Sequence, residues 1–292
     1  MFTQILFNGL VAGAIYALVA LGFSLRFQAT RTFDFSYAAV ITLSAYAAGK
    51  VFEYSGANWV ISALAGCTTA GTVGVLLDVT IFRPMRRSGA RELAILLASL
   101  GTMVAVANSI SLGFGDRQQI IGSAVTHNSI ALGSARITSL QLATIYVALM
   151  VGGFCWYAYH RTRWGLVMRA LADDEVLARC YGISRERLIL QATILAAVIG
   201  SSAAILSAMD TGLSPLIGFQ LLLPGVVASV VGGMGRLGGV VIAGCAIGLI
   251  QQAAGWITSA GWQDPILFAI LLVFLLVRPH GVFGAPLRRS AV

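Results

Sequence analysis

Charged residues are scarce in this chain. Only 10% of its 292 residues are Asp, Glu, Lys or Arg, whereas 58% are hydrophobic. An ordinary water-soluble domain needs more charge than this to cover its surface, so the composition excludes one. Long apolar runs separate the few charges, which indicates a protein that crosses a lipid bilayer several times.

Lysine is almost absent, since Lys50 is the sole lysine in the sequence. Val51 follows it, so the chain has no Walker A loop, in which Ser or Thr comes after the phosphate-binding lysine. We therefore expect no ATP hydrolysis by this chain and no enzymatic activity. The formal charge of +8 comes from arginines spread between apolar runs without interleaved aromatics, so we expect no nucleic-acid binding.

Histidine and cysteine are also few and widely separated. They are His127, His160, His280, Cys67, Cys155, Cys180 and Cys245. Neither a zinc-protease helix motif nor a G-x-S-x-G nucleophile motif is present. We expect no metal site, no cofactor and no disulfide framework in this chain.

Nine apolar segments are candidates for crossing the bilayer, for which about 20 residues are needed. They are residues 4–25, 32–49, 57–82, 93–114, 137–159, 188–209, 213–231, 237–257 and 265–277. We therefore predict an all-α, polytopic membrane protein with about eight to nine transmembrane segments. Residues 1–292 would form a single transmembrane domain with one large cytoplasmic loop, 160–187.

The arginines predict the orientation of the chain, because positive residues collect on the cytoplasmic side. Sixteen of the nineteen basic residues can be laid on one side; only Lys50, Arg117 and Arg136 fall on the other. The N-terminus would then be periplasmic and the C-terminus cytoplasmic.

Two segments do not read as simple lipid-facing helices. The second carries Asp34 close to its start. The charge of Asp34 would be costly at the centre of a bilayer, so we expect this residue near the cytoplasmic end or facing a cavity. The seventh carries Pro215 and Pro224 among several glycines, and proline removes a helical hydrogen bond. We therefore predict that the seventh segment is broken.

The loop 160–187 has the signals of a short helix lying outside the bilayer. They are the i,i+4 pairs Arg169 with Asp173 and Glu175 with Arg179, a terminating Gly182, a capping Ser184 and Glu186 in the next first turn. Its apolar face would consist of Leu166, Ala170, Leu177, Ala178 and Tyr181. This face could enter a cleft of another protein or pack on its own membrane domain, and physical reasoning alone leaves both open.

Glycines crowd the turn between the seventh and eighth segments. Gly225, Gly232, Gly233 and Gly235 are candidates for tight packing or a gate hinge, and Gly244-x-x-x-Gly248 could form a helix contact. The G-x-G-x-x-G fragment at Gly233 is a weak dinucleotide signal, because no βαβ unit surrounds it.

Four motifs together resemble a known family. They are Gly9-Leu-x-x-Gly-x-Ile-Tyr-Ala-Leu-x-Ala-Leu-Gly22, Arg169-Ala170-x-x-Asp173 to Gly182-Ile183, Gly232-Gly-Met-Gly-Arg-Leu-Gly-Gly239 and Arg278-Pro-His-Gly-Val-Phe-Gly284. In this order they resemble the permease subunits of ATP-binding-cassette importers for branched-chain amino acids.

The resemblance implies a bacterial inner-membrane permease with several partners. These would be a homologous second permease, two cytoplasmic ATPases that bind ATP and Mg, and a periplasmic substrate-binding protein. The resemblance also implies that the loop couples the permease to an ATPase. Its coupling residues would be Arg169, Ala170, Asp173, Asp174, Ala178, Gly182, Ile183 and Ser184.

Several substrates and a set of path residues are compatible with the sequence. Where the family often has Asn-Phe-Ala-His-Gly, this chain has Asp34-Phe35-Ser36-Tyr37-Ala38, so urea, short amides and aromatic acids remain alternatives to branched-chain or other hydrophobic amino acids. The expected path residues are Asn8, Tyr16, Phe35, Ser36, Tyr37, Ser214, Phe219 and Gln220. A stand-alone transporter or channel driven through Asp34, Asp78 or Asp210 is the less favoured alternative.

Overall fold

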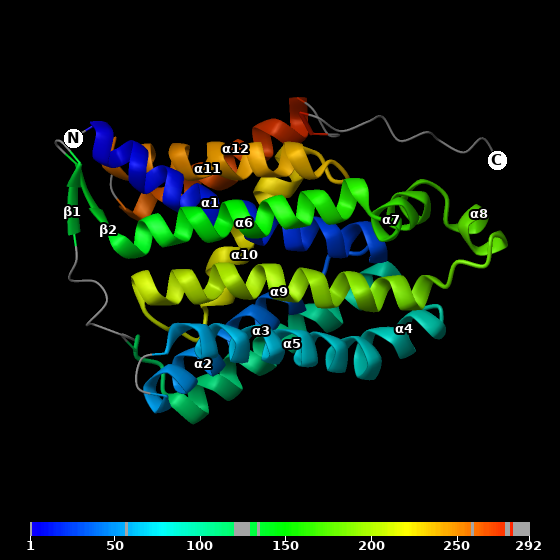
Figure 1. The fold of residues 1–292 in the computed structure, drawn as a ribbon. Helices are drawn as coiled ribbons and strands as arrows, with labels where there is room; N and C mark the ends of the chain where they lie inside the picture. The colour runs from blue at the N-terminus through cyan, green and yellow to red at the C-terminus, as the bar shows by residue number, and fades with distance from the viewer. Residues whose placement is uncertain are drawn as a thin grey trace.

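The computed structural model describes residues 2–55, 58–119, 129–132, 135–257, 260–277 and 281–282. Its long helices run side by side along the length of one bundle (Figure 1). A helix satisfies its backbone hydrogen bonds internally, which is why long apolar runs in lipid adopt this form. Each of the nine predicted segments contains a helix in the described part of the chain.

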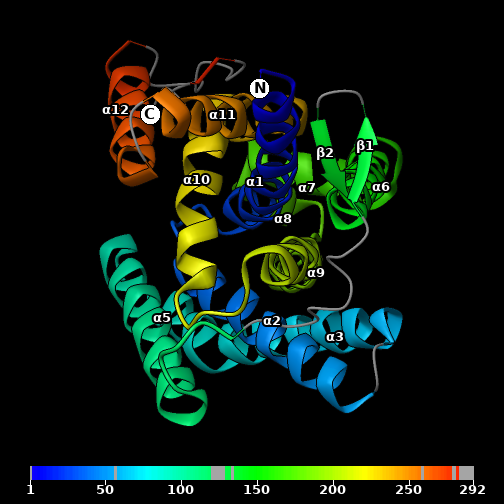
Figure 2. The same cartoon turned by 90° about the vertical axis from the view of Figure 1, so that its left-hand side faces the viewer.

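Two helices form the centre of the bundle. They are α1 (Phe2–Thr30) and α9 (Arg185–Thr211), and the other helices surround them (Figure 2). On one side, α10 (Ile217–Gly232) and α11 (Leu237–Ile257) pack against α1. On the other, α2 (Ser36–Tyr54) and α3 (Trp59–Leu77) pack against α9.

The outer helices are α5 (Glu92–Phe114), α6 (Ser139–Arg161) and α12 (Gln263–Val277). Large apolar side chains such as Leu97, Leu149 and Leu276 are exposed on them. Lipid tails can cover such side chains, so their exposure suits a membrane protein.

Six helices among the described residues are long and apolar enough to cross a membrane. They are Thr3–Thr30, Trp59–Arg87, Glu92–Phe114, Ser139–Arg161, Arg185–Thr211 and Leu237–Trp256. α10 and α12 are apolar but shorter. α2 carries hydroxyls, Lys50 and Glu53, and most of its side chains are buried against neighbouring helices rather than facing lipid. The prediction of a helical, multi-pass membrane protein is thus confirmed.

The third predicted segment extends further than the sequence indicated. After α3, a π-helical turn, η1 (Asp78–Phe82), leads into α4 (Arg83–Arg87). Asp78 is buried there and accepts hydrogen bonds from both terminal nitrogens of Arg86, at 2.8 and 3.1 Å. This pairing allows the helix to continue past a buried carboxylate.

The break in the seventh segment lies before α10 rather than at Pro224. The chain leaves α9 at Gly212, which has a φ of +94°, and Leu213 forms a backbone bridge with Gln119. α10 then begins at Ile217 and continues through Pro224. The prediction of a break is therefore correct near Pro215 and wrong at Pro224.

The two ends of the bundle differ. At one end lie the N-terminus and a hairpin that the all-α expectation missed, formed by β1 (Ser129–Leu132) and β2 (Ala135–Thr138) (Figure 1). The short η2 (Ala260–Trp262) precedes α12. At the opposite end lie α4, α7 (Arg163–Asp173) and α8 (Glu175–Cys180) (Figure 1). Arginines are frequent in and beside these three helices.

Candidate functional site

The loop between α6 and α9 folds as two helices, where the sequence predicted one. Asp174 interrupts it with an extended backbone, φ −147° and ψ 108°. Its Oδ1 accepts a hydrogen bond from the Leu177 amide at 3.0 Å and thereby caps α8. Gly182 has a φ of +78°, which confirms its predicted left-handed conformation after α8.

One side of this loop is packed and the other is open. Met168, Leu171 and Ala178 are buried against the membrane helices. Leu166 is 63% exposed, Leu177 58% and Tyr181 80%. Ala170 is exposed too. We call the side formed by Leu166, Ala170, Leu177 and Tyr181 the exposed apolar face; the expectation that Ala178 belongs to it is wrong.

The charges of the loop are arranged differently from the predicted pairs. The Arg169 guanidinium lies 5.5 Å from the centre of the Tyr159 ring, and Asp173 is exposed. Among the described residues, Arg169 and Asp173 form no ion pair. The side chains of Glu175 and Arg179 lie outside the described residues.

The end of the loop is held by contacts that the sequence did not indicate. Ser184 occupies the N-cap position of α9, although its side chain makes no capping hydrogen bond, and Ile183 is half-buried. Glu186, in the first turn as predicted, accepts hydrogen bonds from Arg83 and Arg87 of α4. Partners about 100 residues apart leave no local pattern, so sequence reasoning missed this contact.

The turn between α1 and α2 also reaches the loop. Arg31 has a φ of +58°, and its guanidinium donates to the carbonyl oxygen of Ala172 in α7. Within the turn, Asp34 pairs with Arg26 at 2.5 Å and accepts from the Ser36 amide at 2.8 Å. Asp34 therefore sits at a helix end, as predicted, and is neutralised there.

The carboxylates of the alternative ion-driven mechanism are not free in the middle of the bundle. Asp34 pairs with Arg26, and Asp78 with Arg86. Asp210 lies at the last turn of α9 and is exposed. This arrangement gives the ion-driven alternative no support, since such carriers use charges near the midplane.

Two of the predicted path residues are locked into the protein core. Tyr37 is fully buried and its Oη donates to the Ala196 carbonyl oxygen at 3.0 Å, between Gly22 and Gly200. Ser36 is also buried, and its hydroxyl donates to Asp34 at 2.6 Å. Neither lines an open path in this conformation, and their role in the path stays a prediction.

The other predicted path residues do not form one site. Asn8 lines a cavity of about 280 Å³ at the end of the bundle that holds the N-terminus, together with Gln4, Ile5, Gln252, Gly255, Trp256 and Gln263. Phe35 lies in the turn at the opposite end, where its amide donates to Ser99 Oγ at 3.0 Å. Tyr16, Ser214 and Phe219 are partly buried, and Gln220 is exposed.

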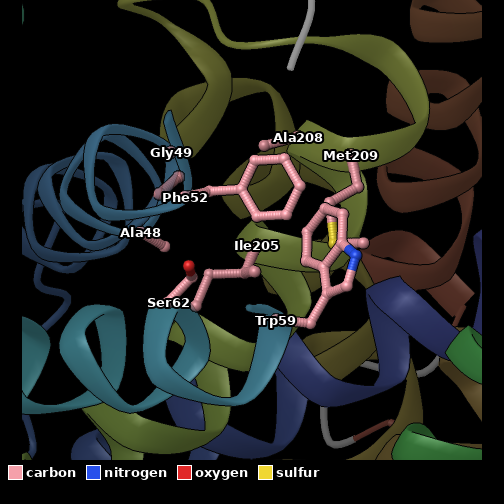
Figure 3. A pocket seen from close by; sticks show the side chains of 9 residues that line it. Ala48, Gly49, Phe52, Trp59, Ser62, Ile205, Ala208 and Met209 are labelled. Carbon is pink, nitrogen blue, oxygen red and sulfur yellow. The ribbon is translucent and has the colours of Figure 1, made fainter. Parts of the chain in front are cut away.

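A second cavity, between α2, α3 and α9, is too small for an organic substrate. Figure 3 shows the rings of Phe52 and Trp59 beside Ile205 and Met209 around it. The two ring centres are 4.0 Å apart, and the cavity measures about 10 Å³. That volume is about enough for one water molecule.

The predicted packing glycines make close backbone contacts. A Cβ on Gly248 would come within 2.2 Å of the Gly13 amide nitrogen, and one on Gly244 within 2.7 Å of Ala17 Cα, so the Gly244-x-x-x-Gly248 contact with α1 is confirmed. A Cβ on Gly225 would come within 2.7 Å of Val19 Cγ1, which is a side-chain atom of α1.

The turn after α10 brings two of the quoted motifs together. Gly232 approaches the Gly239 carbonyl at the start of α11, while Gly233 and Gly235 have φ values of +94° and +112°. The Val282 amide donates to the Val231 carbonyl oxygen at 2.8 Å, and Gly281 lies against Gly233. The rest of the motif 278–284 lies outside the described residues.

Comparison with known proteins identifies the family. The family model described as "Branched-chain amino acid transport system / permease component" matches residues 5–276. The high-affinity branched-chain amino acid transport system permease protein LivH of Salmonella typhimurium is 27% identical, over 98% of this chain and 96% of its own length. BraD of Pseudomonas aeruginosa, a permease protein of the same kind of system, is 24% identical over the same shares.

Two more distant proteins are also similar, one in sequence and one in structure. The ribose import permease RbsC of Escherichia coli is 21% identical over 93% of this chain and 84% of its own length. A solved structure, PsaBC from Streptococcus pneumoniae in complex with Fab, superposes with a TM-score of 0.52 at 13% identity, covering 96% of this chain and 93% of that chain. At this identity the structural likeness concerns the fold alone. The match over residues 5–276 settles the family: the chain belongs to the branched-chain amino acid transport permeases.

Proposed function

We propose that this chain is one of two membrane subunits of an ATP-driven importer and forms half of its translocation path. Its partners are a homologous permease, two cytoplasmic ATPases that hold ATP and Mg, and a periplasmic substrate-binding protein. Membership of the permease family supports this assembly.

The observation that carries the proposal is the exposed apolar face. Leu166, Leu177 and Tyr181 lie between the spans that end at Arg161 and begin at Arg185, so lipid tails do not cover them. Water is a poor environment for three large apolar side chains on one short loop. A cleft in an ATPase would bury them, with Ala170, Asp173, Asp174, Gly182, Ile183 and Ser184 at its border.

We place this face in the cytoplasm of a bacterial cell, with the membrane subunit in the inner membrane. Arginines 83, 86, 87, 161, 163, 169, 185 and 187 gather at the same end as α7 and α8, and positive residues favour the cytoplasmic side. The N-terminus is then periplasmic and the C-terminus cytoplasmic. In this arrangement α2, α10 and α12 cross together with the six longer spans, which gives nine crossings.

We propose branched-chain or other hydrophobic amino acids as the substrate. LivH and BraD, which match nearly the full chain, are named as permeases of branched-chain amino acid systems. Of the two cavities described above, one lies at the end of the bundle that holds the N-terminus and the other has room for about one water molecule, so neither runs through the chain. We therefore place the path on the face shared with the second permease. Phe219 and Gln220 of α10 are only partly covered by this chain and are our candidates on that face.

Purification with the native neighbours tests this proposal. The chain is expressed with the genes beside it, extracted gently, and the co-purifying proteins are identified by mass. Uptake of radiolabelled leucine, urea and phenylalanine is then measured in liposomes with ATP and the binding protein. The proposal expects an ATPase in the complex and ATP-dependent leucine uptake; accumulation by the isolated chain on an ion gradient alone would contradict it.

A further inference from the structure

The loop between α6 and α9, together with the first turn of α9 that follows it, is tied to other membrane helices at two places away from the exposed apolar face. At the first, Arg31 donates to the Ala172 carbonyl oxygen near the end of α7. At the second, Glu186 in the first turn of α9 accepts from Arg83 and Arg87 of α4. We call these the Arg31 tie and the Glu186 tie.

The Glu186 tie fixes two helices in relation to each other. Arg87 approaches the carboxylate with two nitrogens, Nε to Oε1 at 2.9 Å and Nη2 to Oε2 at 3.1 Å, and Arg83 binds Oε2 as well. A two-pronged contact between guanidinium and carboxylate fixes direction as well as distance. The contact therefore joins the start of α9 to the end of the α3–α4 span.

The Arg31 tie reaches other helices through a strained turn. A positive φ is uncommon for a residue other than glycine, and Arg31 holds one at +58° while its side chain spans to α7. The same turn joins α5, because the Phe35 amide donates to Ser99 Oγ at 3.0 Å. A displacement of α7 is thus passed to the start of α2 and to α5.

Between the two ties, part of α8 is exposed. Of the α8 side chains that the structure describes, Ala178 is buried, whereas Leu177 and Cys180 are exposed. The extended Asp174 separates α7 from α8 and allows them to shift relative to each other. Force applied to the exposed apolar face can therefore reach the membrane helices through the two ties as well as through the buried side chains of Met168, Leu171 and Ala178.

We propose that the Arg31 and Glu186 ties transmit the movement of the loop to two sets of membrane helices during transport. This inference rests on the proposed function and names the residues through which it operates. Arg31, Arg83, Arg87 and Glu186 are positioning residues: they touch neither substrate nor nucleotide. Removing a tie should separate ATP hydrolysis from uptake without dissociating the ATPase.

The test uses the complete importer in liposomes and measures substrate taken up per ATP hydrolysed. Glu186→Gln keeps the shape of the side chain and removes its charge, and Arg31→Gly keeps the left-handed backbone and removes the guanidinium. We expect both to retain the ATPase and its hydrolysis within about twofold, while uptake per ATP falls at least about fivefold, the low end of typical coupling effects. The triple exchange Glu186→Arg, Arg83→Glu and Arg87→Glu should restore part of this ratio.

The matched control is Glu53→Gln. Glu53 pairs with Lys50 at 2.8 Å near the C-terminal end of α2. Its side chain is 52% exposed, against 35% for Glu186, and removal of its charge should leave the ratio unchanged. Unchanged uptake per ATP in Glu186→Gln overturns the Glu186 tie, and unchanged uptake per ATP in Arg31→Gly overturns the Arg31 tie, even if the other variant does not fold. Parallel loss of thermal stability, hydrolysis and uptake would indicate a merely structural role and also overturn the inference. Absence of any ATPase from the wild-type complex would instead overturn the proposed function.

Discussion

Exposed apolar side chains occur in two regions of this protein and have different explanations. On α6, Leu149 is 70% exposed and Phe154 62%; on the loop after it, Leu177 is 58% exposed and Tyr181 80%. The first pair lies within a span long enough to cross the bilayer, so lipid covers it. The second pair lies outside every span in the described part of the chain. We therefore propose a protein partner as the cover of the second region and not of the first.

A second contrast separates the central from the outer helices. The most apolar 18-residue windows of α1, α5 and α9 have the same mean hydropathy, yet 61% and 67% of the residues in the α1 and α9 windows are buried, against 22% in the α5 window. The difference lies in close-packing glycines. A Cβ on Gly200 would meet Tyr37 Oη at 2.1 Å, whereas one on Gly101 would meet nothing within 4 Å. Hydropathy identifies the membrane helices. Which of them are central depends on how closely neighbouring helices can pack against their glycines.

The largest expected effect follows from the second contrast. Gly200→Leu places a large side chain against Tyr37 and Ile41, and overpacking of this kind costs about 1 to 3 kcal/mol or more. We expect little monodisperse protein in detergent by fluorescence-detected size exclusion. The control Gly101→Leu should behave like wild type; equal loss in both would remove the distinction between central and outer helices.

The next effect tests the lipid-facing region. Leu149→Glu puts a carboxylate near the middle of α6, where a charged side chain costs about 2.5 to 3.5 kcal/mol. We expect a clear drop in the amount of protein in the membrane fraction on immunoblots. Wild-type amounts would mean that protein or water, and not lipid, surrounds Leu149.

A leucine-to-glutamate substitution in the loop should weaken binding of the ATPase and leave insertion of the chain into the membrane unchanged. Leu177→Glu removes an apolar anchor from the proposed docking face, and losing one such anchor costs about 2 kcal/mol, or about 30-fold in affinity. We expect normal amounts in the membrane and a weak ATPase complex in pull-down titrations. Unchanged affinity, with Leu166→Glu also unchanged, would show that the exposed apolar face does not bind the ATPase.

The smallest expected effect concerns Tyr37. Tyr37→Phe removes one buried hydrogen bond to Ala196, worth about 1 kcal/mol. We expect the Tm in detergent to fall by a few degrees while uptake stays within about twofold. A large loss of uptake at unchanged Tm would return Tyr37 to the translocation path.

Features that depend on local chain geometry could be predicted from the sequence. The positive φ of Gly182, the first-turn position of Glu186 and the contact side of Gly244 and Gly248 follow from short motifs. The break at Asp174 could have been found as well, because Asp is a good helix cap. The one-helix prediction gave more weight to the i,i+4 charges than to this cap.

Contacts between distant parts of the chain could not be predicted. Arg83 and Glu186 are 103 positions apart, and Arg31 and Ala172 are 141 apart, so no periodicity links them. The burial of the predicted path residues could not be predicted from the sequence for the same reason. Tyr37 is polar and aromatic in sequence, but Gly22 and Gly200 leave room for its ring in the core, which only the helix arrangement reveals.

The central claim is that α8 lies on the cytoplasmic side of the membrane, and labelling of Cys180 can measure this. Cys180 is exposed, so a variant that retains it and lacks Cys67, Cys155 and Cys245 can be treated with a membrane-impermeant maleimide. The account predicts no labelling in intact spheroplasts, rapid labelling in inside-out vesicles, and protection when the ATPase is bound. Labelling of Cys180 in intact spheroplasts would place the loop in the periplasm and contradict the account.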